Sequence, residues 1–275
     1  MTFKTALLAA LMAAASRPVM GQDLALVGVT VVDPSAKVSA VPGQTVLISK
    51  GIIQTVGASA AVLVPKGTRR VDGTGKFVIP GLWDARVRLA GGAGALSRFV
   101  ALGITSVRVA GAAPGAVAGM PRVAGGVLLH EVPHDSLAAL NTAPDAVRDS
   151  VYLELAKTGG WYVPALVHSA DSAANVHRMH ELGLLLLAGT DGEPDVDVTV
   201  HEELAMLVER GGLEPVEALW SATIGPARFA GLGGRLGRSV AGQVADLVLL
   251  DANPLENIRN TRRISAVVQA GRLVP

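Results

Sequence analysis

Six histidines and no cysteine define the metal chemistry open to this 275-residue chain. Without cysteine there is no disulfide, no thiolate zinc site and no thiol nucleophile, so any metal must be held by His, Asp or Glu. His177 and His180 lie one helical turn apart beside Glu181, a spacing that suits either chelation or a solvated helix face. His168 follows an apolar run and His201 begins a helical one, so each is a candidate ligand or an ordinary loop or helix-start residue.

His130 and His134 are further candidate site residues, on either side of a Val-Pro pair. Glu202 and Glu203 follow His201 and are interpreted as first-turn charges that the helix dipole favours. The sequence has no G-x-S-x-G elbow, no complete P-loop and no complete dinucleotide fingerprint. It therefore lacks the motifs of serine hydrolases and of the common nucleotide-binding folds.

Composition excludes several classes of protein. The chain is 50% hydrophobic, which excludes a disordered protein, and 24 basic against 23 acidic residues give a net charge of +1. Such a balance predicts no nucleic-acid partner and no acidic membrane surface. No stretch beyond the amino terminus has the 18 or more apolar residues of a membrane span, so none is expected. The length fits one large domain or two small ones.

The amino terminus resembles a targeting segment. Lys4 precedes an apolar run over residues 6–15, and small residues follow at Val19 and Gly21. This order is typical of a secretory signal peptide over residues 1–21, with a buried amino-terminal helix as the alternative. A signal peptide implies an exported protein, periplasmic or extracellular.

The two ends of the chain share one pattern of short β-branched runs separated by turn residues, which is typical of small antiparallel sheets. A hairpin is expected around residues 49–51. The predicted terminal strands are 24–32, 46–49, 52–56, 245–250, 264–269 and 272–274.

The middle of the chain alternates apolar runs with helical segments, which predicts βαβ units and a parallel sheet. The predicted strands are 77–82 continuing to 89, 104–109, 123–131, 146–149, 161–167 and 184–189. The predicted helices between and after them are 172–182, 202–210 and 214–222.

Four ordered motifs resemble the metal-dependent amidohydrolase superfamily, in its secreted branch akin to imidazolonepropionase and Xaa-Pro dipeptidase. Residues 77–89, F-V-I-P-G-L-W-D-A-R-V-R-L, resemble its first barrel strand, P-G-L-x-D-x-H-x-H-L. The L-A-G-T-D of residues 187–191 looks like the eighth strand. Residues 213–228 resemble the following helix pair, and residues 237–254 resemble the returning sandwich segment.

The resemblance implies an α/β fold: an incomplete (β/α)₈ TIM-like barrel over residues 77–235, flanked by a β-sandwich from residues 22–76 and 236–275. About 159 residues then remain for a barrel that typically takes about 250. The family's activity is hydrolysis of carbon–nitrogen bonds in a small amide, cyclic amide or dipeptide. It uses one or two divalent metals, commonly zinc, which lower the pKa of bound water.

The sequence departs from the family at most metal positions. Arg86 and Arg88 occupy the H-x-H pair, and a guanidinium has no lone pair to give a metal. The fourth strand and its lysine have no counterpart. The fifth-strand histidine falls at His130 or Glu131, and only Asp191 stands clearly in place. The sixth-strand E-H pair corresponds to Arg148-Asp149.

Two hypotheses account for the arginines. Arg86 and Arg88 pair with the carboxylates of Asp191, Asp149 and Glu131 as a charge-balanced plug, or they are exposed because the barrel is not formed. The plug favours impaired or lost catalysis. Its alternatives are a binding protein with an Arg-lined anion pocket and an internally deleted remnant.

If the protein is instead an active hydrolase, Asp191 is the expected metal ligand and base. The substitute metal ligands are then expected among His130, His168 and His201.

Overall fold

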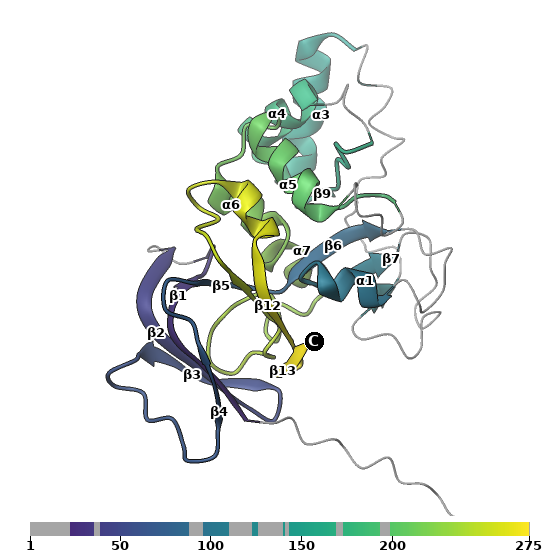
Figure 1. Cartoon of the computed structure of the whole chain (residues 1–275). Helices are drawn as coiled ribbons and strands as arrows, with labels where there is room; N and C mark the ends of the chain where they lie inside the picture. Colours follow the sequence, from purple (N-terminus) through teal and green to yellow (C-terminus); the bar gives the residue numbers. More distant parts are fainter. Residues whose placement is uncertain are drawn as a thin grey trace, which may run out of the picture.

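The computed structural model describes residues 23–35, 39–87, 96–109, 123–125, 140, 143–168, 173–192 and 199–274 (Figure 1). The predicted signal peptide at residues 1–21 lies outside these ranges and stays a prediction. Arg88, His130, Glu131 and His134 also lie outside them. No helix within these ranges reaches the length and hydropathy that crossing a bilayer requires.

Strands from both ends of the chain form one eight-stranded sheet (Figure 1). Its order is β13-β12-β11-β5-β1-β2-β3, with β4 paired to β1. The strands are β1 (Leu24–Val32), β2 (Ala40–Ser49), β3 (Ile52–Ala58), β4 (Arg69–Asp72), β5 (Phe77–Pro80), β11 (Leu247–Leu250), β12 (Ile264–Gln269) and β13 (Arg272–Val274). The predicted hairpin is confirmed between β2 and β3, where Lys50 and Gly51 both have positive φ.

A single apolar cluster joins the two ends across this sheet. It includes Leu24, Leu26 and Ile48 from the first strands and Leu247 and Val268 from the last, all at most 2% exposed. Burial of these alternating side chains explains why the ends pair. The sandwich and its boundaries at residues 22–76 and 236–275 stay predictions.

The predicted run from residue 77 to 89 crosses from one sheet to another at Gly81. Before Gly81, β5 lies between β1 and β11 in the eight-stranded sheet. After it, β6 (Leu82–Val87) begins a parallel sheet of order β6-β7-β8, with β7 (Ile104–Val109) and β8 (Val123–Gly125). One continuous run thus connects the two halves of the fold.

The other edge of β6 lies beside the segment that ends in Asp191. There, Ala85 N–H donates to the Ala188 carbonyl at 2.9 Å, and Leu187 N–H donates to the Tyr162 carbonyl at 2.9 Å. The short parallel strands β9 (Trp161–Tyr162) and β10 (Leu185–Leu186) extend this wall. The segment with the L-A-G-T-D motif therefore neighbours the first-strand motif, as the resemblance implies.

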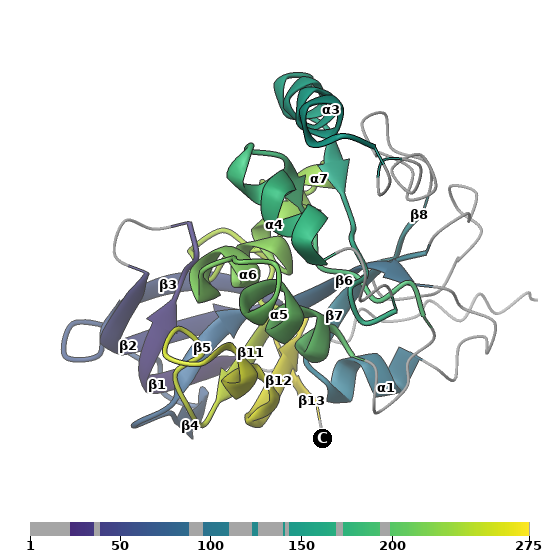
Figure 2. The same cartoon turned by 90° about the horizontal axis from the view of Figure 1, so that it is seen from above.

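Helices pack beside these strands, and Figure 2 shows α5 lying between α6 and the strands β6 and β7. They are α1 (Leu96–Ala101), α3 (Asp145–Lys157), α4 (Ala173–Glu181), α5 (Val200–Glu209), α6 (Pro215–Ser221) and α7 (Ile224–Phe229), with a 3₁₀ helix, η4 (Ile258–Arg262). The predicted strand at residues 146–149 is wrong, because these residues form the first turn of α3. Asp145 at its start and Lys157 at its end suit the helix dipole.

Replacing Gly81 with alanine is expected to destabilise the protein by about 2 kcal/mol, because overpacking forces neighbouring atoms apart. A Cβ at Gly81 would lie 2.2 Å from the Thr105 Oγ1 and 2.9 Å from its Cβ. Gly234→Ala is the matched control, since a Cβ there meets nothing within 4 Å. Urea unfolding of both variants measures the difference, and equal free energies of unfolding would contradict the close approach.

Candidate functional site

Asp84 is the buried acid of the first-strand motif and is 1% exposed. Its carboxylate accepts three hydrogen bonds: from the Thr190 hydroxyl at 2.7 Å, the Thr190 N–H at 3.0 Å and the Arg86 N–H at 3.1 Å. Burial, with a smaller contribution from the nearby charge of Asp191, nevertheless raises the pKa of Asp84 to about 7. Asp84 therefore ties β6 to the segment that precedes Asp191.

Arg86 and Asp191 form an ion pair at the carboxyl end of β6. The Arg86 Nε–H donates to Asp191 Oδ1 at 3.0 Å, and both side chains are less than one fifth exposed. The backbone repeats the contact, since Asp191 N–H donates to the Arg86 carbonyl at 2.7 Å. Asp191 has a φ of 52°, a left-handed conformation that Asp tolerates better than most residues.

His168 lies beside this pair. A Cβ on Gly192 would be 2.8 Å from the His168 Nε2, so the imidazole contacts the backbone directly after Asp191. Its position follows β9 and is exposed. Of the histidines that the structure describes, His168 is thus the one placed next to Asp191.

Glu203 lies beneath the turn that carries His168. It is fully buried in the first turn of α5, and its Oε2 accepts the Val167 N–H at 3.0 Å. Its Oε1 is buried without a hydrogen-bond partner among the described residues. Burial raises the pKa of Glu203 to about 8, against the hydrogen bonds from Leu166 and Val167 that lower it. Glu203 lies in the first turn of α5 as expected, but its raised pKa contradicts the interpretation of it as a charge that the helix dipole favours.

A second arginine, Arg108, lies on β7 and contacts β6. Arg108 is 3% exposed, and its Nε–H donates to the Ala85 carbonyl at 2.8 Å. Its guanidinium carbon lies 5.4 Å from the centre of the Phe229 ring, a cation–π distance. Sequence reasoning missed Arg108, Asp84 and Glu203 as site residues. The signal available was a charged residue inside a strand that is otherwise uncharged, as in I-T-S-V-R-V.

Asp149 does not join the plug, which corrects that part of the hypothesis. It lies on α3, where it accepts hydrogen bonds from Arg178 Nε at 3.0 Å and Nη2 at 2.6 Å. The reason is the local structure: a helix at residues 146–149 turns the side chain toward α4 rather than into the wall. Among the predicted partners that the structure describes, only Asp191 pairs with Arg86.

His201 is also corrected as a candidate metal ligand. Its Nε2–H donates to the Leu102 carbonyl at 2.9 Å, and its Nδ1 lies 3.0 Å from the Thr261 hydroxyl. Burial lowers the pKa of His201 to about 4, so the ring is neutral. Leu102 lies just before the start of β7, whereas Arg86 and Asp191 lie near the other end of these parallel strands. His201 therefore joins α5 to its neighbours rather than to the site.

The histidine pair on α4 forms separate contacts. His177 Nε2 lies 3.4 Å from Glu181 Oε1, and His180 Nε2 lies 3.3 Å from Glu217 Oε2. The two rings therefore meet different carboxylates. The interpretation as an ordinary helix face fits these contacts better than chelation.

Comparison with known proteins identifies the family of this chain. Residues 105–274 match the amidohydrolase family, and the chain belongs to that family. It is 33% identical over 140 residues to imidazolonepropionase of Rubrobacter xylanophilus, covering 44% of this chain and 34% of that protein. It is 34% identical over 95 residues to ochratoxinase of Aspergillus niger, covering 33% of this chain and 19% of the relative.

Solved structures support the same architecture. The crystal structure of a putative prolidase from Bifidobacterium longum superposes with a TM-score of 0.72 at 20% identity. That match covers 93% of this chain and 95% of the other. A sequence identity of 20% supports a shared fold and nothing further. In sequence, the chain aligns with about a third of the imidazolonepropionase and a fifth of the ochratoxinase.

The residues at Asp191 do not fit the divalent metal that the family generally uses. The Asp191 carboxylate is occupied by a guanidinium, which stays protonated and offers no lone pair. Within the described ranges, no three His, Asp or Glu side chains gather as a metal site. The site as built is an ion pair flanked by an imidazole and a buried acid.

Proposed function

We propose that this protein is a non-hydrolytic member of the amidohydrolase family, in which the Arg86–Asp191 ion pair replaces the metal centre. The observation that carries the proposal is the 3.0 Å contact between the Arg86 Nε and Asp191 Oδ1. The fixed positive charge of the guanidinium repels a divalent cation. It also neutralises the negative charge of Asp191 that a metal would otherwise neutralise. It cannot lower the pKa of a bound water by coordination, as a metal does.

An incomplete barrel is the second part of the proposal. Residues 77–235 offer about 159 positions, against a typical length of about 250 for a (β/α)₈ barrel. Parallel pairing of β6, β7 and β8 on one side, and of β9 and β10 on the other, supports a barrel-like wall around Arg86. A chain that lost the fourth strand would also lose the family's lysine ligand.

A second candidate function is hydrolysis of a carbon–nitrogen bond, in which Asp191 and His168 serve a rebuilt site. The observation in its favour is the contact of His168 with the backbone of Gly192, which places an imidazole beside Asp191. This function requires Arg86 to leave Asp191. An anion-binding role requires the same exchange, with the ligand taking the place of the carboxylate.

Metal content and hydrolysis test the proposal together. The protein is purified without chelator, incubated with zinc and freed of unbound metal. We expect inductively coupled plasma mass spectrometry to find far less than one metal ion per chain. Hydrolysis of a panel of Xaa-Pro dipeptides is expected to equal the blank, and Asp191→Asn is expected to change neither result.

Stoichiometric zinc, with turnover that Asp191→Asn abolishes, would overturn the proposal in favour of the hydrolase. A thermal unfolding curve without a cooperative transition would also overturn it, in favour of a deleted remnant.

A further inference from the structure

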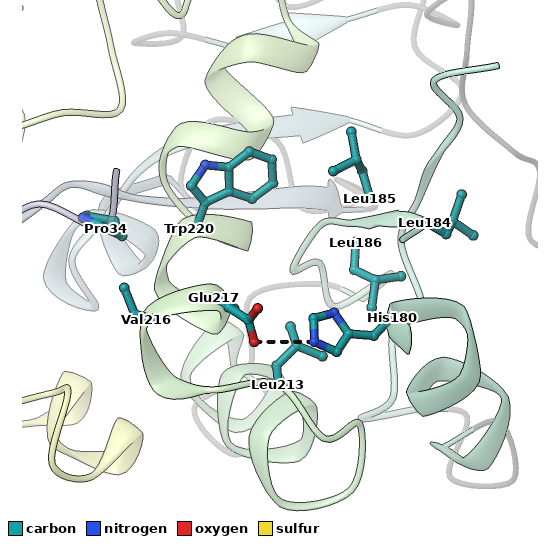
Figure 3. Close-up of a pocket in the computed structure, with 9 residues that line it drawn as sticks. All are labelled: Pro34, His180, Leu184, Leu185, Leu186, Leu213, Val216, Glu217 and Trp220. Carbon is teal, nitrogen blue, oxygen red and sulfur yellow. Dashed lines mark ion pairs between the residues drawn. The ribbon is translucent and has the colours of Figure 1, made fainter. Parts of the chain in front are cut away.

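A pocket of about 250 Å³ opens at the start of the segment that ends in Asp191 (Figure 3). Its walls come from α4, β10 and α6, with Pro34 after β1 closing one side. In Figure 3, Trp220 and Leu185 lie at the top of this space and the His180–Glu217 ion pair lies at the bottom. One end of the pocket is therefore apolar and the other is polar.

The apolar end is rigid and partly exposed to water. Leu185 is 38% exposed although its neighbours Leu184 and Leu186 are buried, so it presents a large hydrocarbon surface to the pocket. The Trp220 indole stacks on Trp161, with ring centres 6.0 Å apart and an interplanar angle of 2°. A fixed indole gives a ligand a flat surface without loss of side-chain freedom.

The polar end holds a carboxylate in a fixed direction. Glu217 Oε2 accepts the Glu214 N–H at 2.8 Å, as part of the capping box that begins α6. His180 Nε2 approaches the same oxygen at 3.3 Å. Because the backbone already orients Glu217, the carboxylate needs little reorganisation to receive a donor.

The charges at the pocket favour a cation. Among its described lining residues there is no lysine and no arginine, and the basic side chain is His180, which is charged only when protonated. Glu217 lies one turn from Trp220 on α6. An indole face attracts positive charge, and so does a carboxylate. Glu181 follows His180 on α4, but it does not line the pocket and its carboxylate pairs with Arg178 at 2.8 Å.

We propose that this pocket binds a small organic ammonium ion. Its hydrocarbon body lies against Trp220 and Leu185, and its charged nitrogen faces Glu217. A volume of about 250 Å³ is below the range of drug-sized sites, so the ligand has about one ring and a short arm. The site is independent of the Arg86–Asp191 pair, which lies at the other end of the same segment.

Three probes of one shape test the proposal: benzylammonium, benzyl alcohol and benzoate, titrated into the intact protein by calorimetry and by tryptophan fluorescence. We expect benzylammonium to bind about tenfold more tightly than benzyl alcohol and benzoate to bind most weakly. Glu217→Gln is expected to remove the preference for the cation, because glutamine still accepts the Glu214 N–H but carries no charge. Unchanged binding of benzyl alcohol shows that the variant keeps the pocket.

Glu181→Gln is the matched control, since it removes one negative charge from the neighbouring helix without altering the pocket wall. It is expected to leave the preference intact. Equal affinity for benzylammonium and benzyl alcohol would overturn the proposal, and so would an equal loss in Glu181→Gln and Glu217→Gln. If none of the probes binds and light scattering shows a dimer that Leu185→Ser dissociates, the surface belongs to a second copy of the chain.

Discussion

Replacing Arg86 with methionine is expected to lower the free energy of unfolding by about 3 kcal/mol, because it removes the guanidinium that pairs with the largely buried carboxylate of Asp191. Methionine keeps most of the length of the side chain, so the loss reflects charge and hydrogen bonding more than volume. Asp191→Asn is the matched change on the other side. Asparagine also tolerates the left-handed backbone of this residue, whose φ is 52°.

The double variant Arg86→Met/Asp191→Asn completes a cycle that isolates the interaction energy between the two side chains from their interactions with the surroundings. We expect it to recover about 2 kcal/mol relative to Arg86→Met, because it removes both charges of the pair and not one alone. Urea unfolding of the four proteins at pH 7 gives the coupling energy. Lys157→Met serves as the surface control, because the Lys157–Glu154 pair is about 70% exposed and its loss is expected to have no measurable effect.

Additivity of the two single changes would contradict the plug. It would mean that Arg86 and Asp191 act separately, as they would if the arginine were exposed or if Asp191 served another ligand. A strong coupling energy would instead support the proposed replacement of the metal centre, in which the guanidinium supplies the positive charge that keeps Asp191 in place.

The strands at the chain ends could be predicted because their signals are local. β1, β12 and β13 have the bounds expected from alternating β-branched residues, and the hairpin follows from the turn preference of Lys50-Gly51. Asp191 and Arg86 could be predicted as neighbours because two motifs of one family implied adjacent parallel strands. That the two chain ends lie together was implied by the family resemblance, not by their strand pattern alone.

The rest depended on information that is not local. The segment 146–149 was expected to be a strand from the alternation of apolar runs and helical segments, although Pro144 and Asp145 are typical of a helix start and Lys157 of its end. The burial of Glu203 could not be inferred, because an acid in a first helical turn is usually solvated. The turn at Leu166 and Val167, contributed by a distant segment, donates hydrogen bonds to it.

Raising the pH from about 5 to 9 is expected to destabilise the protein, because two buried acids keep their protons in the folded chain. The pKa of Asp84 is raised to about 7 and that of Glu203 to about 8, above their ordinary values of 3.8 and 4.5. The stability that they contribute is complete below about pH 4 and is lost as the pH rises through 7 and 8. Their protons are held by the folded state and released by the unfolded one.

The contribution of His201 to stability changes with pH in the opposite direction. Its pKa falls from 6.5 to about 4, so its contribution is complete above pH 6.5 and is lost as the pH falls toward 4. Between pH 5 and 6.5 the folded chain still binds more protons than the unfolded chain, since two acids outweigh one histidine. The free energy of unfolding therefore falls with rising pH across this range and, more steeply, just above it.

Glu203→Gln isolates the largest part of this dependence. At pH 5 the variant is expected to match the parent, because glutamine resembles the protonated acid and still accepts the Val167 N–H. At pH 9 it is expected to be more stable than the parent by about 4 kcal/mol, since no buried group must then ionise. Urea unfolding at pH 5, 7 and 9 measures the gap.

Glu202→Gln provides the control, because Glu202 pairs with Arg259 and Arg262 at the surface and is about 30% exposed. It is expected to lose a little stability at both pH 7 and pH 9 and to show no gap that grows with pH. A constant difference between Glu203→Gln and its parent from pH 5 to 9 would mean that Glu203 is ionised throughout. The Oε1 atom would then need a positive partner that the described residues do not supply.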